Sequence, residues 1–258
     1  MKIREILAGT MLTLATIGAG AAAAADLPTR VYKAPTMAAP VASTWTGCYI
    51  GAEGGGAWGS SRQVSAGMPT AGLPITNNFG LSGGTVGGTV GCNYQVNSWV
   101  FGIENDMSWT NAKGNSPDMV PFNRFAVSHT NQDWLDTLRG RVGFSWDRAL
   151  IYGTGGAAFA GTSAVICNSA VGLCGSDSQT RTGWVAGAGI EYAVWKDISL
   201  KFEYLHADFG SARYFNTPVH LLPTSTIVAR EVRLSDDLVR VGLNWRFTSL
   251  PGMFNFNP

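Results

Sequence analysis

Apolar and polar residues alternate along several stretches of the chain. The last of them, LVRVGLNWRF at residues 238–247, places Arg240, Gly242 and Arg246 between apolar neighbours. A period of two puts successive side chains on opposite faces of a β-strand, whereas the period of a helix is about 3.6 residues. The stretch therefore predicts a strand with one apolar face. By itself it leaves open whether that face packs on a protein core or meets lipid.

Eight such stretches follow one another between Trp45 and Phe247. Each has at least about the 9–11 residues that a tilted transmembrane strand needs. Three joints are short and polar, around Asn97, Asp147 and Asp197, and four are long, near residues 60–80, 110–132, 162–181 and 210–232. Strict alternation of short and long joints is typical of outer-membrane barrels, which have tight periplasmic turns and long extracellular loops. We therefore predict an all-β fold over residues 45–247, an eight-stranded antiparallel transmembrane β-barrel with both ends at the periplasm.

Charged residues in these stretches share the phase of the small residues. They are Glu53, Glu104, Asp106, Arg139, Arg141, Glu191, Lys201, Glu203, Arg240 and Arg246. The opposite phase is apolar, as at Phe101 and Ile103, and we find no charge on it. Because a charge facing lipid costs about 2–4 kcal/mol at the midplane, the charged side chains are expected to face the lumen. The fifth stretch, LIYGTGGAAFAG, is too rich in Gly and Ala for its faces to be assigned.

The N-terminal residues have the features of a secretory signal. A basic start precedes an apolar run at residues 6–17, which is shorter than the roughly 20 residues of a membrane-spanning helix, and small residues follow it. We expect residues 1–25 to be a signal peptide, residues 26–44 a Pro/Ala-rich periplasmic linker and residues 248–258 a short C-terminal tail. A net charge of +1 gives no general attraction to nucleic acid, so no nucleic-acid partner is expected.

Composition and aromatic positions favour the membrane interpretation. Charged residues are 14% of the chain against about a quarter usually, and glycine contributes 33 residues. Tryptophans lie beside the three expected short turns and at the two ends of the barrel. They are Trp99, Trp146 and Trp195, with Trp45 at the start and Trp245 or Phe247 at the end. This placement predicts an aromatic girdle at the periplasmic interface.

Four cysteines in an exported chain are expected to form disulfides, and three pairings are possible. Cys48 and Cys92 fall at similar height on the first two strands, near the periplasmic rim, while Cys167 and Cys174 share the third long loop. Topology therefore favours Cys48–Cys92 and Cys167–Cys174. A metal site is not expected, because the second pair has no histidine nearby and the first belongs to strands.

Catalytic and cofactor motifs are weak. His206 has no serine in a setting that would suit a hydrolase, and the glycine-rich stretches lack the helix start and Lys of a phosphate-binding loop. An eight-stranded barrel has an interior just wide enough to be filled by side chains. We therefore predict no enzyme, no cofactor and a filled lumen.

Several motifs together resemble a known family. They are WTGCYIGAEGG at 45–55, VFGIENDMSWTN at 100–111, TLRGRVGFSWDR at 137–148, IYGTGG at 151–156, EYLHADFG at 203–210 and the terminal VGLNWRF. They resemble the small outer-membrane proteins of alphaproteobacteria related to the Brucella 25- and 31-kDa surface antigens, a porin-family group. The resemblance implies an OmpA-like barrel and an insertion signal in the last strand, at Leu243, Trp245 and Phe247. Family members end near that final aromatic residue, whereas here eleven residues follow it.

Two functional interpretations stay open at this point. The first is an integral outer-membrane protein of a Gram-negative bacterium with a structural and cell-surface interaction role. Its expected partners are outer-membrane lipid and lipopolysaccharide, the outer-membrane assembly machinery and an unknown extracellular partner of the loops. The second is a narrow porin-like channel or a haem- or ligand-binding surface protein, for which the loop candidates are His129, His220, Tyr214 and Met119.

Overall fold

The computed structural model describes residues 44–258 except 124, 171, 217–218, 223–224, 228, 248, 251–253 and 256–258. The predicted signal peptide and all but the last residue of the predicted linker lie outside the described residues. Within the described part, no helix has the length and apolar character needed to cross a membrane.

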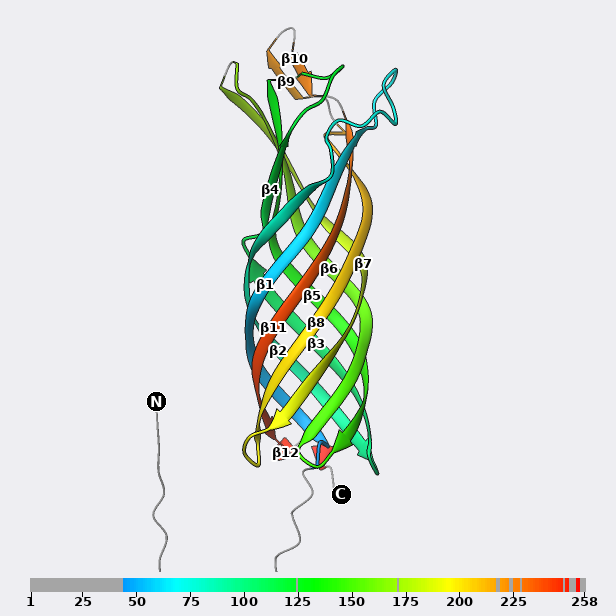
Figure 1. Ribbon diagram of the computed structural model, residues 1–258, viewed down its shortest axis with the longest axis vertical. Coiled ribbons are helices and arrows are strands. Elements are labelled where there is room, and N and C mark those ends of the chain that lie inside the picture. Colours follow the sequence, from blue (N-terminus) through cyan, green and yellow to red (C-terminus); the bar gives the residue numbers. More distant parts are fainter. Residues whose placement is uncertain are drawn as a thin grey trace, which may run out of the picture. The chain divides into compact units, whose positions relative to one another are not determined.

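Eight long strands close into an antiparallel ring (Figure 1). In chain order they are β1 (Gly47–Ser65), β2 (Phe79–Val96), β3 (Trp99–Thr110), β5 (Ala126–Trp146), β6 (Ala149–Asn168), β7 (Leu173–Ala193), β8 (Ile198–Tyr214) and β11 (Arg230–Phe247). Each pairs with its neighbours in sequence, and β1 pairs with both β2 and β11, which closes the ring. The predicted eight-stranded barrel is therefore confirmed.

Five short strands lie outside this ring. They are β4 (Lys113–Pro117), β9 (Val219–Leu222), β10 (Ser225–Ile227), β12 (Ser249–Leu250) and β13 (Phe254–Asn255). Strand β4 extends the sheet by pairing with β5 along its whole length and with β2 at one position. The other four form two separate hairpins, β9 with β10 and β12 with β13.

Two of the predicted short joints are two-residue turns. Asn97 and Asp147 each have φ of 54°, between the β2–β3 and β5–β6 pairs. Tight hairpin turns of this type need positive φ, which Asn and Asp tolerate better than other side chains. Local turn chemistry therefore explains why these joints are readable in the sequence.

Except for β3, which ends at Thr110 as predicted, the long strands extend further toward the extracellular end than predicted, so most of the predicted loop boundaries are wrong. Strands β5 and β7 have 21 residues each and β6 has 20. The β5–β6 ladder continues to the pair Ala126 and Asn168, through segments that were expected to be loops. These upper segments are rich in Ser, Thr, Asn and Gln and have no lipid-facing apolar row, so the alternation that marks a membrane strand is missing from them.

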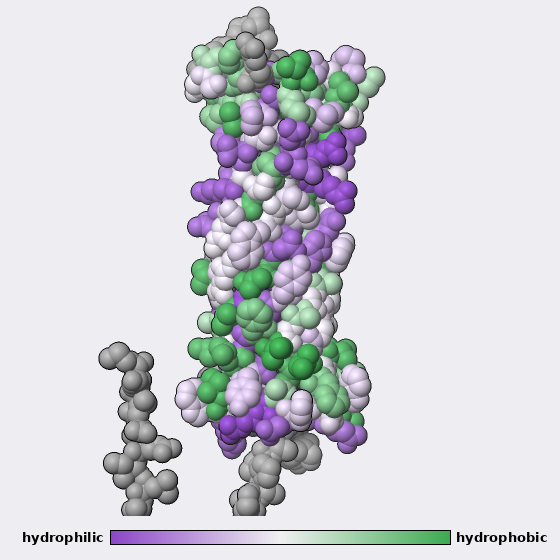
Figure 2. Space-filling view, viewed as in Figure 1, coloured by the Kyte–Doolittle hydropathy of each residue, from purple (hydrophilic) through white to green (hydrophobic). Residues whose placement is uncertain are grey.

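The outer surface of the barrel has an apolar belt with a hydrophilic band above it, toward the β4 and β9–β10 end (Figure 2). Trp99, Trp146, Trp195 and Trp245 lie on the outside near the short turns, with 53–78% of their surface exposed. These four positions agree with the predicted girdle. Trp45 does not, because it is 1% exposed and packs inside with Val100, Leu150, Tyr152 and Ala193. It closes the periplasmic end of the lumen instead.

Strand β6, whose faces the sequence left open, alternates regularly. Tyr152, Ala158 and Ala160 are buried on its inner face, whereas Ile151 is 58% exposed on its outer face. Small residues therefore occupy both the inner and the outer face of this strand, which explains why hydropathy could not distinguish the two faces.

Two charged side chains of the predicted stretches do lie on the outer phase, contrary to prediction, namely Asp136 on β5 and Asp208 on β8. Asp136 of β5 is half-buried there, and its carboxylate accepts a hydrogen bond of 2.8 Å from the Asn105 amide. It stands one outward position below Trp134, which pairs with Trp109 at the extracellular rim. The free-energy cost of a charge that faces lipid falls from the bilayer midplane toward the membrane surface. The hydrogen bond from the Asn105 amide lowers this cost further.

Candidate functional site in the barrel lumen

Nine of the ten predicted lumen charges meet inside the lower half of the barrel. They are Glu53 on β1, Glu104 and Asp106 on β3, Arg139 and Arg141 on β5, Glu191 on β7, Lys201 and Glu203 on β8 and Arg240 on β11. Each of these residues is at most 4% exposed. Six strands thus contribute inward positions to one buried cluster, which we call the charged network.

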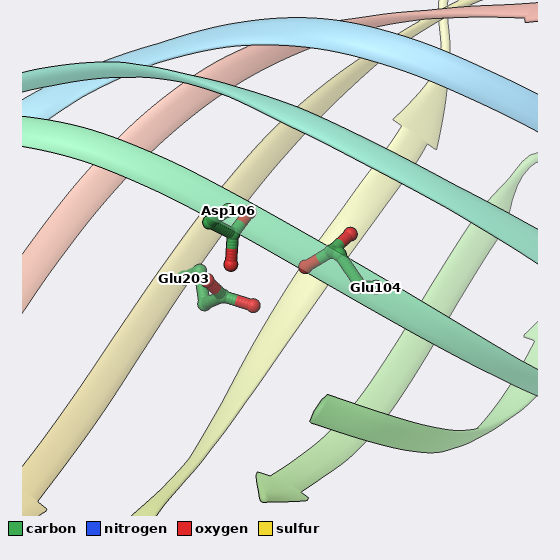
Figure 3. A group of neighbouring side chains, drawn as sticks. All are labelled: Glu104, Asp106 and Glu203. Carbon is green, nitrogen blue, oxygen red and sulfur yellow. The ribbon is translucent and has the colours of Figure 1, made fainter. Parts of the chain in front are cut away.

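Arg139 is the centre of the charged network. Its guanidinium lies 2.5 Å from the Glu104 carboxylate and 2.9 Å from that of Glu203, and it also pairs with Asp106. Figure 3 shows these three carboxylates turned toward one another from β3 and β8. Their ligand atoms lie within 4.8 Å of one another, a spacing that suits a metal ion. Because Arg139 contacts all three, the protein supplies the counter-charge itself.

Arg240 and Lys201 extend the charged network toward β1. Arg240 pairs with Glu53, lies 2.6 Å from Glu203 and lies 3.2 Å from Asp106. The Lys201 ammonium lies 3.1 Å from Glu53 and 3.3 Å from Glu104. Several carboxylates therefore contact more than one cation. Removing any one charged side chain leaves at least one buried neighbour with one ion-pair partner fewer.

Two tyrosines and Arg141 form the periplasmic layer of the charged network. The Tyr49 hydroxyl donates to Glu104 at 2.5 Å and the Tyr152 hydroxyl to Glu203 at 2.9 Å. The Arg141 guanidinium lies over both rings, 4.8 and 5.1 Å from their centres, a cation–π arrangement. It also lies 3.1 Å from Glu191. The tyrosines were missed by the sequence analysis, although both occupy the same inward phase as the charges.

Glycines make room for these large side chains in a narrow interior. In the strand register, Arg139 is opposite Gly156, Arg240 is opposite Gly55, and Glu203 is opposite Gly189. Small residues opposite large ones let side chains fill a closed barrel without overlap. The lumen, as well as the lipid-facing belt, thus explains part of the high glycine content.

An apolar layer fills the lumen above the charged network. It consists of Ala57, Leu81, Ala112, Leu135, Ala158, Ala160, Val185, Leu205, Ala207, Phe209, Leu234 and Leu238, all at most 4% exposed. This layer was not predicted from the sequence, because apolar residues were expected to face lipid. A usable signal was present, since Leu238 has the same phase as Arg240.

A second buried ion pair lies at the extracellular end. Arg230 of β11 lies 2.8 Å from the Asp118 carboxylate, and the Ser128 hydroxyl donates to Asp118 at 2.6 Å. Asp118 follows β4, so this pair ties the segment between β4 and β5 across the mouth to β11. Neither Arg230 nor Asp118 was a sequence candidate, because both fall in segments expected to be loops.

Arg246, the tenth predicted lumen charge, is not part of the charged network. It has the inward phase but lies at the rim, where its guanidinium donates to the Lys196 carbonyl oxygen at 2.5 Å and lies over the Trp45 ring. The inward phase of Arg246 was predicted correctly. However, β11 ends one residue later, at Phe247, so Arg246 lies at the periplasmic end and not among the buried charges. Arg246 caps the periplasmic end instead.

The candidates for ligand binding do not converge. Tyr214 is buried on the inner face of β8 and bonds the Thr162 hydroxyl at 2.5 Å, whereas His129 is on the outer phase of β5. Both lie in strands rather than in the expected loops. Met119 does lie in the segment after β4, and the side chain of His220 lies outside the described residues.

The two disulfides join the pairs that topology favoured. Cys48 is bonded to Cys92 between β1 and β2, and Cys167 is bonded to Cys174. Within each bonded pair, the two residues are directly opposite each other in the strand register. The second bridge links β6 to β7, because the expected third loop is mostly strand.

Residues 11–247 match the sequence model of the outer membrane protein beta-barrel domain. The chain belongs to this family. It is 31% identical over 249 residues to the 31 kDa outer-membrane immunogenic protein of Brucella melitensis biotype 1, covering 92% of this chain and 98% of the relative. It is 30% identical over 181 residues to the 22 kDa outer membrane protein of Rhizobium leguminosarum bv. viciae, covering 68% and 71%. The protein is therefore an outer-membrane β-barrel protein of a Gram-negative bacterium, as the motifs predicted.

Solved structures support the same fold. The outer membrane protein OprG from Pseudomonas aeruginosa aligns with a TM-score of 0.51 at 12% identity, covering 80% of this chain and 99% of OprG. The outer membrane protease OmpT from Escherichia coli aligns with a TM-score of 0.50 at 8% identity, covering 79% and 98%. At these identities the likeness concerns the barrel architecture alone.

Proposed function

We propose that this outer-membrane β-barrel is closed to solutes and acts as a structural and cell-surface interaction protein. The observation that carries the proposal is the stacking of filled layers along the lumen. From the periplasmic end they are the Trp45 plug, the charged network, the apolar layer and the Arg230–Asp118 pair. Buried Asp236 and Arg181 lie among the side chains of the apolar layer, so the layer is not purely apolar, but its packed side chains fill the narrow interior and make passage of a solute costly.

Bilayer conductance tests the proposal directly. The detergent-extracted protein, shown to be folded by its boiling-dependent shift on an SDS gel, is expected to give no steady conductance in planar bilayers. The double variant Leu205→Ser/Leu238→Ser, which places hydroxyls in the apolar layer, serves to show that a leak would be detected. Steady conductance of the wild-type protein would contradict a closed lumen and favour the narrow-channel alternative.

The same proposal includes the absence of catalysis. The histidine–carboxylate pair of the described residues is His206 with Asp237, 2.8 Å apart on the outer face of the barrel. The His206 ring packs near Trp184, with ring centres 5.6 Å apart, and in the described part of the chain no serine hydroxyl bonds it. A nucleophile hydrogen-bonded to the base is what a triad requires.

Three surfaces of the barrel would meet the partners that this proposal implies. Leu243 and Trp245 face outward on the last strand, and the Phe247 ring lies 6.4 Å from that of Trp245. These outward apolar side chains of the last barrel strand fit recognition by the outer-membrane assembly machinery. The segments beyond the hydrophilic band would meet an extracellular partner, and the belt would meet lipid and lipopolysaccharide.

A further inference from the structure

Two arginines oppose each other on the outside of the barrel, above the apolar belt. Arg62 of β1 is directly opposite Arg233 of β11 in the ladder, and both side chains are exposed. Like charges directly opposite on neighbouring strands destabilise a sheet. Arg233 reaches the Asp208 carboxylate at 3.5 Å, while Arg62 has no acidic partner in the described part of the chain. The two guanidinium groups therefore carry more positive charge than the single neighbouring carboxylate neutralises.

The arginine pair borders a cavity of about 290 Å³. Its lining consists of Ser60, Ser61, Arg62, Asn78, Arg233 and Ser235. The hydroxyl oxygens of Ser60 and Ser235 are 3.0 Å apart, one outward position below the arginines. The lining thus combines two guanidinium groups with hydroxyl and amide groups and contains no carboxylate. A planar guanidinium suits two-point recognition of phosphate oxygens.

The other charged residues near the cavity have partners of their own and do not neutralise the excess positive charge of Arg62 and Arg233. On β8, Arg213 is directly opposite Glu231 of β11, so that its charge is balanced within the ladder. Asp237, the next outward acid below Ser235, is hydrogen-bonded to Tyr204 and paired with His206. An anion in the cavity would relieve the repulsion between Arg62 and Arg233.

With Trp58 as the upper edge of the apolar belt, strand geometry puts the cavity at the height expected for lipid headgroups. On β1, the outward Trp58 ends the apolar belt, and Ser60 and Arg62 follow. Four residues of strand span about 13 Å, which at a tilt of 35–45° gives about 10 Å of height. The headgroup layer is about 5–8 Å thick on each side of the hydrocarbon, and an arginine side chain reaches back several ångströms. The two serines lie about halfway, inside that layer.

The wall below the cavity leaves room for acyl chains. The outward positions of β1 directly beneath Trp58 are Gly56, over which the Trp58 ring lies, and then Gly54 and Ala52, which carry almost no side chain. We propose that the cavity between Arg62 and Arg233 binds the phosphate of a lipid headgroup in the outer leaflet, with the lipid's chains against this part of β1. A soluble anion could satisfy the arginines but would gain nothing from the adjoining apolar wall.

Native mass spectrometry of the full protein in detergent, titrated with bisphosphorylated lipid A, tests the site. The double variant Arg62→Gln/Arg233→Gln is expected to bind this lipid about tenfold more weakly or worse, because two charge-assisted contacts are lost. Arg148→Gln removes a charge at an exposed periplasmic turn and is expected to bind like the wild type. Dephosphorylated lipid A is expected to bind the wild type as weakly as the double variant binds the phosphorylated lipid.

Three results would overturn the site. Equal affinity of the wild type and the double variant for lipid A would show that these arginines do not bind its phosphate. An equal loss in Arg148→Gln would reduce the effect to net charge. Pyrophosphate binding as tightly as lipid A would assign the cavity to a soluble anion. The boiling-dependent gel shift of each variant checks folding, which exposed substitutions are expected to leave intact.

Discussion

Replacing Arg139 with methionine is expected to lower the free energy of unfolding by about 3–5 kcal/mol, because it leaves buried carboxylates without their cation. Arg139 pairs with Glu104, Asp106 and Glu203, and all four side chains are at most 1% exposed. Without the guanidinium, the three carboxylates repel one another with only Arg240, Lys201 and Arg141 left to balance them. Urea unfolding in lipid vesicles, followed by tryptophan fluorescence, measures the loss.

Two comparisons separate this effect from general damage. Arg148→Met removes an arginine from the exposed turn after β5 and is expected to change stability by no more than about 0.5 kcal/mol. Arg139→Met combined with Asp106→Asn is expected to be less destabilised than the sum of the two single variants, since the pair acts as a unit. If Arg139→Met were no worse than Arg148→Met, the charged network would not be holding the barrel together.

Lipid contact decides how much of this fold could be predicted. Where strands cross the bilayer, one face must be apolar, and a period of two appears in segments such as residues 238–247. Above the belt both faces meet water or polar side chains, so the period disappears although the ladder continues to Asn168 on β6. Strand number and direction were therefore predictable, whereas the upper ends of the strands were not.

The alternation predicted which strand face carries each charged side chain, but it did not predict which charges pair with one another. Alternation assigns Arg139, Glu203 and Arg240 to the lumen, yet the residues that they contact are 33 to 187 positions away in the chain. Which charges share a layer depends on strand stagger, which hydropathy does not encode. The same limit hid the apolar layer, because an inward leucine and a lipid-facing leucine differ only in phase.

Replacing Gly156 with valine is expected to cost at least about 3 kcal/mol or to prevent folding, because overpacking a closed interior forces the backbone apart. A Cβ atom at Gly156 would overlap the carbonyl oxygen of Leu138 and lie 2.7 Å from the Cα atom of Arg139. Both obstacles are backbone atoms of β5, which cannot move away without displacing the central arginine. The same urea titration in vesicles measures the effect, with the boiling-dependent gel shift as a check of assembly.

Gly153 provides a matched control on the same strand. It lies on the outer phase of β6, and the nearest atom to an added Cβ would be the Gly187 carbonyl oxygen at 3.9 Å. Gly153→Val therefore places a β-branched apolar side chain in lipid, and it is expected to be neutral or slightly stabilising. If both substitutions proved equally harmful, glycine would be needed here for the bending of β6. A large loss confined to Gly156 would instead mean that glycine at this position is what allows Arg139 to occupy the lumen.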